Sequence, residues 1–219
     1  MAQSNLTTVL LASGGLDSTT LAYSLIAKGA VVIPLFINYG QHCATTEYET
    51  LMEVLPFACR RRVRIVNISD VYQGALSRLI REPDLWKEDM SGDPLYLPYR
   101  NLLLLTVGAA FAQSHNCNRL YAAFINSNHA KEIDCSAKFF TALGTIFTDY
   151  GGVRVQMPFR HMSKYRVARL ALRLRVPVAK TFSCQAASRI PCGACPNCVD
   201  RLEALRAVQV KTNNRRSKK

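Results

Sequence analysis

The sequence lacks a long apolar run, because no uninterrupted apolar stretch approaches the roughly 18 residues of a membrane span. The first residues, Met1-Ala2-Gln3-Ser4-Asn5, also lack the basic and apolar segments of a signal peptide. Internal repeats and low-complexity segments are missing outside the C-terminal tail. We therefore expect a cytoplasmic protein without membrane contact, whose 219 residues, 49% of them hydrophobic, suffice for a packed core.

Acidic residues are scarce in this chain. Only 15 Asp and Glu stand against 28 Lys and Arg, which gives a formal net charge of +13. Such a surplus suggests an anionic partner, either a nucleic acid or the acidic face of a protein, although a solvated basic surface has the same composition. Residues 211–219 end in Arg215-Arg216-Ser217-Lys218-Lys219 and are expected to form a basic disordered tail.

The cysteines do not have the spacing of a disulfide framework. Four are scattered and are expected to be ordinary buried thiols: Cys43, Cys59, Cys117 and Cys135. The other four lie within fifteen residues: Cys184, Cys192, Cys195 and Cys198.

Two overlapping Cys-x-x-Cys units form most of this cysteine cluster. A Cys-x-x-Cys turn brings two thiolates to about 3.7 Å, the edge of a zinc tetrahedron. Gly193 and Pro196 permit the tight turns that wrap a metal ion. We predict a closed structural Zn²⁺ site, in a zinc-binding loop and terminal helix at residues 183–210. An iron–sulfur cluster and a redox-active cysteine pair are the alternatives.

The sequence also lacks a Walker A loop and a dinucleotide-binding G-x-G-x-x-G fingerprint. In their place, Ser13-Gly14-Gly15-Leu16-Asp17-Ser18-Thr19 lies between an apolar run at 8–10 and a helix-like run at 20–25. A Gly-Gly turn between a strand and a helix lets backbone N–H groups converge on an anion. We therefore predict a phosphate cradle, to which Ser13, Ser18 and Thr19 add hydroxyl groups. A glycine-rich turn without a ligand is the alternative.

Strand-like and helix-like segments alternate along residues 1–182. The alternation predicts an α/β fold, with a parallel sheet covered by helices on both faces. In such sheets ligands bind beyond the carboxyl ends of the strands, where the segments at 13–18, 38–42 and 126–129 should converge. Expected strands lie at 31–37, 62–68, 119–125 and 153–157, and expected helices at 43–58, 101–114, 136–149 and from 163 onward. Residues 69–81 should be partly helical, and 82–99 a loop near the active site.

Several motifs together resemble a known family. The string Ser13–Ser18 is similar to the PP-loop of ATP pyrophosphatases. With Tyr39-Gly40-Gln41, Arg100-Asn101, Met162-Ser163-Lys164 and the cysteine cluster, residues 7–208 resemble the 7-cyano-7-deazaguanine synthase family of the queuosine pathway. The resemblance implies an α/β PP-loop fold, ATP, Mg²⁺ and one structural zinc, and a homodimer. It implies a ligase that adenylates 7-carboxy-7-deazaguanine, releases pyrophosphate, and uses ammonia to make an amide and then a nitrile.

The resemblance also assigns roles to individual residues. The ATP phosphates would contact Ser13, Gly14, Gly15, Asp17, Ser18 and Thr19. The nucleotide or base pocket would include Tyr39 and Gln41, which could instead simply cap a strand. The catalytic groups would be Asp17, near Mg²⁺, Arg100, and Lys164, which would neutralise charge on the α-phosphate. The acid substrate would contact Arg100, Asn101, Asn126, Asn128 and Asp134. Arg100 and Lys164 have the alternative of being solvated surface charges.

The segment at 123–136 departs from the family pattern on the substrate side of the pocket. Asn128 stands for an aspartate, Lys131-Glu132-Ile133 for Gly-Tyr-Pro, and Ser136 for an arginine, whereas Asp134-Cys135 matches. The chain thus resembles a divergent member of the family, and its acceptor stays open. Ammonia is one acceptor; an amine of a protein or nucleic acid, as in antiphage defence, is another. A non-catalytic nucleic-acid-binding relative and a tRNA thiolase or lysidine-type enzyme are further alternatives.

Overall fold

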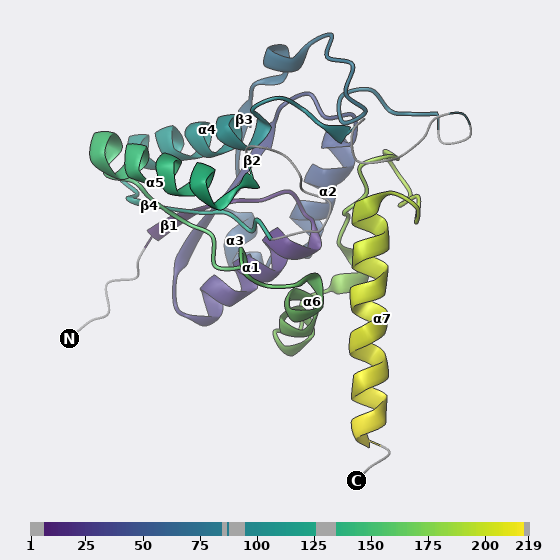
Figure 1. Cartoon of the computed structure of the whole chain (residues 1–219). Helices are drawn as coiled ribbons and strands as arrows, with labels where there is room; N and C mark the ends of the chain where they lie inside the picture. Colours follow the sequence, from purple (N-terminus) through teal and green to yellow (C-terminus); the bar gives the residue numbers. More distant parts are fainter. Residues whose placement is uncertain (1–6, 85–86, 88–94, 126–134, 217–219) are drawn as a thin grey trace, which may run out of the picture.

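A parallel sheet forms the centre of the protein, as the computed structural model shows for residues 7–84, 87, 95–125 and 135–216 (Figure 1). The strand order within this part of the chain is β3-β2-β1-β4-β5, and every pairing is parallel. The elements are β1 (Thr7–Leu11), α1 (Leu16–Ala27), β2 (Val31–Asn38), α2 (Ala44–Val54), α3 (Phe57–Arg60), β3 (Arg64–Asn67), η1 (Ser69–Tyr72), α4 (Arg100–Ser114), β4 (Arg119–Tyr121), α5 (Ala137–Gly151), β5 (Arg154–Gln156), α6 (Lys164–Arg173), η4 (Val178–Lys180) and α7 (Pro196–Arg216).

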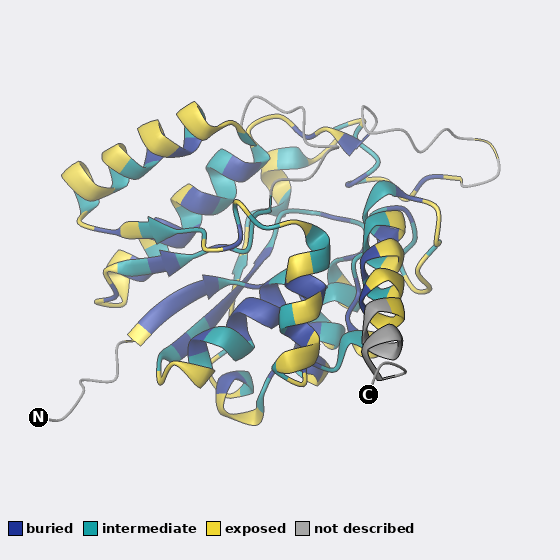
Figure 2. Ribbon diagram, turned by 60° about the horizontal axis from the view of Figure 1, so that its bottom comes forward, coloured by how far each residue is buried: buried dark blue, intermediate teal, exposed yellow. Residues whose placement is uncertain are grey.

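Helices cover both faces of the sheet, as predicted. Alternate residues of β1 point to opposite faces: Val9 packs with α4 and α5, and Leu10 packs with α1 and α2. Three residues of β1 are fully buried, so the strand is almost entirely dark in Figure 2. Burial on both faces explains why this strand reads as a continuous apolar run, the pattern of a central parallel strand.

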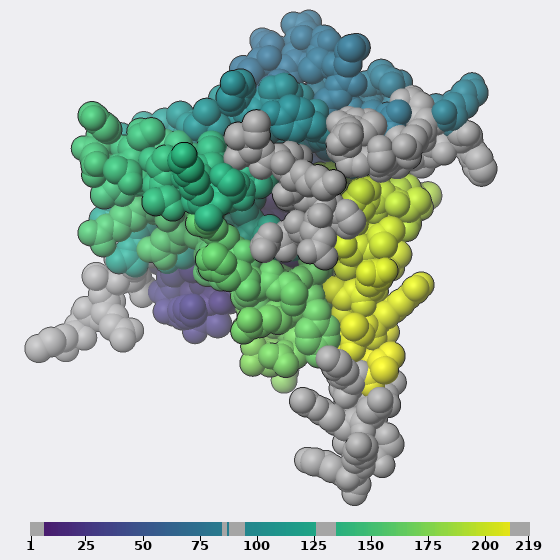
Figure 3. Space-filling view, viewed as in Figure 1, coloured from purple at the N-terminus to yellow at the C-terminus, as the bar shows by residue number. Residues whose placement is uncertain are grey.

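The C-terminal helix packs against α6 and not against the sheet. Ala168 and Ala171 of α6 meet Ala204 and Val208 of α7 in a separate small apolar cluster, which also includes Leu16 of α1. Small side chains let the helices approach closely, and the yellow surface of α7 adjoins the green surface of α6 in Figure 3. This contact links the cysteine-rich segment before α7 to the helix that follows β1.

The structure corrects three sequence predictions. The helix expected at 43–58 is two helices, because Leu55 before Pro56 has extended backbone (ψ 146°) and ends α2. The strand expected at 119–125 ends at Tyr121, and residues 122–125 line a cavity instead. Helix α7 continues to Arg216, so helical backbone extends into the tail that was expected to be disordered from 211.

No helix of the described residues is long and apolar enough to cross a membrane. The order of the strands brings the carboxyl ends of β1, β2 and β4 together at one edge of the sheet. This edge is where the sequence predicts the ligand site.

Candidate active site and metal centre

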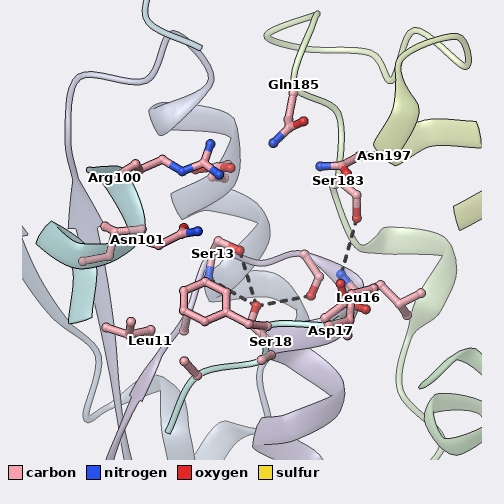
Figure 4. Close-up of a pocket in the computed structure, with 18 of the residues that line it drawn as sticks. Leu11, Ser13, Leu16, Asp17, Ser18, Arg100, Asn101, Ser183, Gln185 and Asn197 are labelled. Atoms are coloured by element: carbon pink, nitrogen blue, oxygen red, sulfur yellow. Dashed lines mark hydrogen bonds between the residues drawn. The ribbon is translucent and has the colours of Figure 1, made fainter. Parts of the chain in front are cut away.

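A cavity of about 500 Å³ lies at the carboxyl ends of β1, β2 and β4, a size that suits a nucleotide or a similar small molecule. Residues from distant parts of the chain face it: Arg100 and Asn101 from α4, and Ser183, Gln185 and Asn197 from the cysteine-rich segment (Figure 4). The structure brings together most of the predicted site residues here: Ser13, Gly15, Asp17, Ser18, Tyr39, Gln41, Arg100, Asn101 and Lys164.

The loop between β1 and α1 has the geometry of an anion cradle. Gly14 has a φ of +72°, and a Cβ atom there would lie 2.7 Å from the carbonyl oxygen of Glu47, so only glycine fits. Gly15 is the N-cap of α1 and has no side chain to cap the helix. The Ser18 hydroxyl lies 3.3 Å from the amide nitrogen of Ser13 and 3.4 Å from its hydroxyl oxygen. Amides and hydroxyls therefore meet at the N-terminus of α1, where an anion is favoured.

Thr19 does not line this cavity, although the sequence suggested that its hydroxyl joins the cradle. Its side chain is fully buried, and the hydroxyl has no hydrogen-bond partner among the described residues. Asp17 and Thr19 are two positions apart, which is about 200° around a helix, so both cannot face the same cavity.

Asp17 and Lys164 form a close ion pair at the edge of the cradle. Lys164 Nζ lies 2.6 Å from Asp17 Oδ2, and both side chains are largely buried. The other carboxylate oxygen, Asp17 Oδ1, is buried and has no partner among the described residues. A buried carboxylate oxygen without a donor fits a hard divalent cation such as Mg²⁺, which prefers oxygen ligands.

A second carboxyl group in the cavity is that of Glu47, which lies in the first turn of α2 and contacts the turn after β2. Gln41 is buried, accepts from the Tyr39 amide through Oε1 at 2.9 Å, and donates from Nε2 to Glu47 Oε2 at 2.9 Å. Burial raises the pKa of Glu47 to about 7, although hydrogen bonds from Gln41 and Cys43 limit the rise. Burial likewise raises the pKa of Tyr39, so its phenol stays protonated. The sequence did not single out Glu47.

The first residues of α4 form the opposite side of the cavity. Asn101 is buried and its Nδ2 donates to Cys135 Sγ at 2.9 Å. Arg100 hydrogen-bonds with Tyr39, and its positive charge opposes the rise in the pKa of that phenol. A guanidinium beside the cradle suits a carboxylate or a phosphate. The other predicted substrate residues, Asn126, Asn128 and Asp134, lie outside the described residues.

The four clustered cysteines meet, as predicted, in a site that could hold a metal. Their Sγ atoms all lie within 4.8 Å of one another. This distance suits a single ion, because a cluster of several irons would separate the sulfurs further. Backbone amides of Ala186, Ala187 and Cys192 donate to Cys184 Sγ at 3.3–3.4 Å.

The charge balance of the site also fits zinc. Hydrogen bonds from the Cys195 and Cys198 thiols lower the pKa of Cys184, whereas the contact with Cys184 raises the pKa of Cys195 to about 11. Without a cation the site therefore favours one thiolate only, and a divalent ion would supply the charge that ionises the others.

The cysteine-rich segment also forms one side of the cavity, which the sequence did not predict. The Phe182 amide donates to the Gly14 carbonyl at 3.2 Å, and the Leu16 amide lies 3.5 Å from Ser183 Oγ. His42 contacts the Gln185 carbonyl through Nε2 at 3.1 Å and so holds this segment against the turn after β2. The segment that carries the cysteine cluster thus contributes residues to the cavity.

Comparisons with known proteins identify the family of this chain. The family model described as "Queuosine biosynthesis protein QueC" matches residues 7–209. The 7-cyano-7-deazaguanine synthase of Archaeoglobus fulgidus is 33% identical over 210 residues, which cover 93% of this chain and 87% of that protein. The enzyme of the same name from Methanoregula boonei is 31% identical over 207 residues, covering 90% of this chain and 93% of that protein.

A solved structure shares the fold at much lower identity. It is a 4-thiouridine synthetase in complex with RNA and bound ATP, with a TM-score of 0.52 and 14% identity over 95% of this chain and 52% of that one. The family match over residues 7–209 and the two relatives establish that this chain belongs to the QueC family of 7-cyano-7-deazaguanine synthases.

Proposed function

We propose that the protein uses ATP to adenylate a 7-carboxy-7-deazaguanine-type acid and passes the acyl group to ammonia, which gives an amide and then a nitrile. The names of the relatives support the deazaguanine substrate. The observation that carries the proposal is the Asp17–Lys164 pair beside the Ser13–Ser18 loop, because adenylation needs a cation and a metal-binding carboxylate at the phosphates.

The loop, Lys164, Asp17 and Arg100 each have a task in this chemistry. Loop amides and the Ser13 and Ser18 hydroxyls bind phosphate oxygens, and Lys164 offsets the negative charge that develops as the acid attacks the α-phosphate. Asp17 would hold Mg²⁺, which supplies further positive charge at the phosphates when bound. Arg100 orients the carboxylate of the acid, which places its oxygen for in-line attack and lets pyrophosphate leave.

The test uses ATP, 7-carboxy-7-deazaguanine and ammonium, with AMP, pyrophosphate, amide and nitrile as the measured products. Lys164→Met should slow acid-dependent pyrophosphate release by at least about 100-fold, the usual size of a lost charge contact in a transition state. Lys180→Met is the matched control, because Lys180 makes an ion pair of the same 2.6 Å length with Glu53 on the exposed surface. Equal effects in the two variants would contradict the proposed role of Lys164.

A second candidate keeps the activation step and changes the acceptor to an amine of a macromolecule. Helix α6 favours it: the helix begins at Lys164 in the cavity and presents the exposed Arg166, Arg169 and Arg173 beyond it. No described acidic group pairs with these arginines, so they form a basic patch on the exposed face of the helix that begins at the cavity. A free nitrile as the sole product, in the presence of candidate acceptors, would exclude this alternative.

A further inference from the structure

Glu47 is a titratable side chain of the cavity that the proposed phosphate chemistry does not use. It lies in the first turn of α2, lines the cavity and is partly buried. Its backbone abuts the cradle, since a Cβ atom on Gly14 would lie 2.7 Å from the Glu47 carbonyl oxygen. The carboxyl group is therefore part of the same site as the Ser13–Ser18 loop.

The position of this carboxyl group is fixed by a hydrogen-bonded turn. Gln41 Nε2 donates to Glu47 Oε2 at 2.9 Å, and Gln41 is itself locked by the Tyr39 amide. The Cys43 thiol also hydrogen-bonds with Glu47. A fixed orientation is what a group needs when it exchanges a proton with a bound molecule.

The charged and titratable groups around Glu47 leave it able to gain and lose a proton. Arg100 faces it from α4, and Tyr39 and Cys43 face it from the turn after β2. Burial raises the pKa of Tyr39 and Cys43, so both stay neutral, and it raises the pKa of Glu47 to about 7. A carboxylate whose pKa lies near 7 accepts protons far better than an exposed carboxylate with an ordinary pKa does.

The other acids of the described cavity lining are less suited to this role. Asp17 is paired with Lys164 at 2.6 Å and already has a role in the proposed phosphate chemistry. Asp200 belongs to α7, on the side formed by the cysteine-rich segment. His161 also lines the cavity but is exposed, and it is the competing candidate for the base.

The proposed reaction needs such a base. Ammonia in neutral water is almost entirely ammonium, whose nitrogen cannot attack a carbonyl carbon before it loses a proton. In the complete step the nitrogen–carbon bond forms, the bond from the acyl carbon to the phosphate oxygen breaks, and AMP leaves with the electron pair. One proton must leave the nitrogen before this attack and another during it. In the later conversion of the amide to the nitrile, the amide oxygen attacks the α-phosphate of a second ATP and pyrophosphate leaves. The C–O bond then breaks, AMP departs with the amide oxygen, and the nitrogen loses both of its remaining protons.

We propose, on the basis of the function proposed above, that Glu47 is the general base that accepts these protons from the attacking nitrogen. Glu47 returns each proton to solvent between steps. Recognition of the guanine-like edge of the acid by the same carboxylate is the competing role. The two roles differ in the half-reaction that they affect: a base acts only after adenylation, whereas an edge contact acts before it.

The experiment separates the two half-reactions in Glu47→Gln. Acid-dependent exchange of labelled pyrophosphate into ATP reports adenylation, and amide formation from ammonium at pH 7 reports the second step. We expect exchange within about threefold of the unchanged protein and amide formation slower by at least about 100-fold. Hydroxylamine, which is unprotonated at pH 7, should restore acyl transfer as hydroxamate to within about tenfold, because it needs less help from a base.

Two variants serve as controls. Glu49→Gln makes the same change on the exposed side of α2 and should leave both half-reactions unchanged. His161→Gln should also leave amide formation within about threefold, and a selective loss there would overturn the assignment to Glu47.

Other results contradict the inference in recognisable ways. An equal loss of exchange and amide formation in Glu47→Gln would show a binding or structural role, as would failure of hydroxylamine to restore transfer. Unchanged amide formation would show that Glu47 is not the base. If the unchanged protein shows no acid-dependent exchange, the proposed function itself fails, and that outcome does not depend on any variant.

Discussion

The cavity has two sides that the chain builds in different ways. The phosphate side comes from consecutive residues, Ser13 to Ser18, at the end of one strand. A second side joins the turn after β2 to the cysteine-rich segment, through contacts such as that of His42 with the Gln185 carbonyl. The first side depends on local backbone geometry, and the second depends on the metal site and on long-range packing. Substitutions on the two sides should therefore have different effects on zinc content, stability and ATP binding.

The largest expected effect is on the metal-dependent side. Cys195→Ser removes a fully buried ligand, so bound zinc should be lost together with roughly 4 kcal/mol or more of folding free energy. Metal content and urea unfolding measure both quantities. Cys117→Ala, at a buried cysteine outside the cluster, should retain zinc and cost only about 1 kcal/mol. Full zinc occupancy in Cys195→Ser would remove the reason to treat this side as metal-dependent.

Gly14→Ala tests the phosphate side with a matched control. Gly29 has a similar φ of +80° but open space around a Cβ atom, so Gly29→Ala should cost about 1 kcal/mol from backbone strain alone. Gly14→Ala adds the clash with α2 and should cost about 3 kcal/mol, measured by urea unfolding. Zinc content should not change. Equal costs at the two glycines would mean that α2 does not pack against the loop as described.

Glu47 predicts a pH dependence of stability. Its pKa in the folded protein, about 7, exceeds the ordinary value of 4.5, so the folded state holds the proton more tightly than the unfolded state. The stability from this group is fully present below about pH 4.5 and is lost as the pH rises through 7. Glu47→Gln should remove that loss. Between pH 4 and pH 8 its free energy of unfolding should rise by about 2 kcal/mol relative to that of the unchanged protein, a figure that allows for the partial exposure of Glu47. Thermal unfolding across this pH range measures the effect for the unchanged protein, for Glu47→Gln and for Glu49→Gln as the control. If the stability profiles of both variants match that of the unchanged protein, the burial of Glu47 is refuted.

The smallest expected effect lies where the two sides meet. Ser183 Oγ accepts a long hydrogen bond, 3.5 Å, from the Leu16 amide. Ser183→Ala should cost only about 0.5 kcal/mol but weaken ATP binding about threefold, because it loosens the first turn of α1. Ser136→Ala removes the N-cap bond to the Phe139 amide of α5 and should cost about 1 kcal/mol without changing ATP affinity. Isothermal titration with ATP distinguishes the two outcomes.

The same two sides explain how far the sequence could predict the site. The loop and the cysteine cluster were predictable because their geometry is set by neighbouring residues, in a Gly-Gly turn and in Cys-x-x-Cys turns. Thr19 was misplaced because a helix turns adjacent positions to different faces. Glu47 was missed because nothing in the sequence shows that α2 packs on the loop. A usable signal was its position as an acid in the first turn of the helix that follows a buried strand.

The boundary of the fourth strand was missed for a similar reason. Residues 122–125 continue the apolar pattern of β4, but they line the cavity and form no further ladder. An apolar run alone does not distinguish a strand from the wall of a pocket that follows it.

The central claim is that ATP activates a carboxylate through its α-phosphate. An acid labelled with oxygen-18 in its carboxylate tests this directly, with mass spectrometry of the nucleotide and phosphate products. Adenylation moves one labelled oxygen into each AMP and leaves pyrophosphate unlabelled. Label in inorganic phosphate, accompanied by ADP, would show attack at the γ-phosphate and contradict the role assigned to the Ser13–Ser18 loop and Lys164.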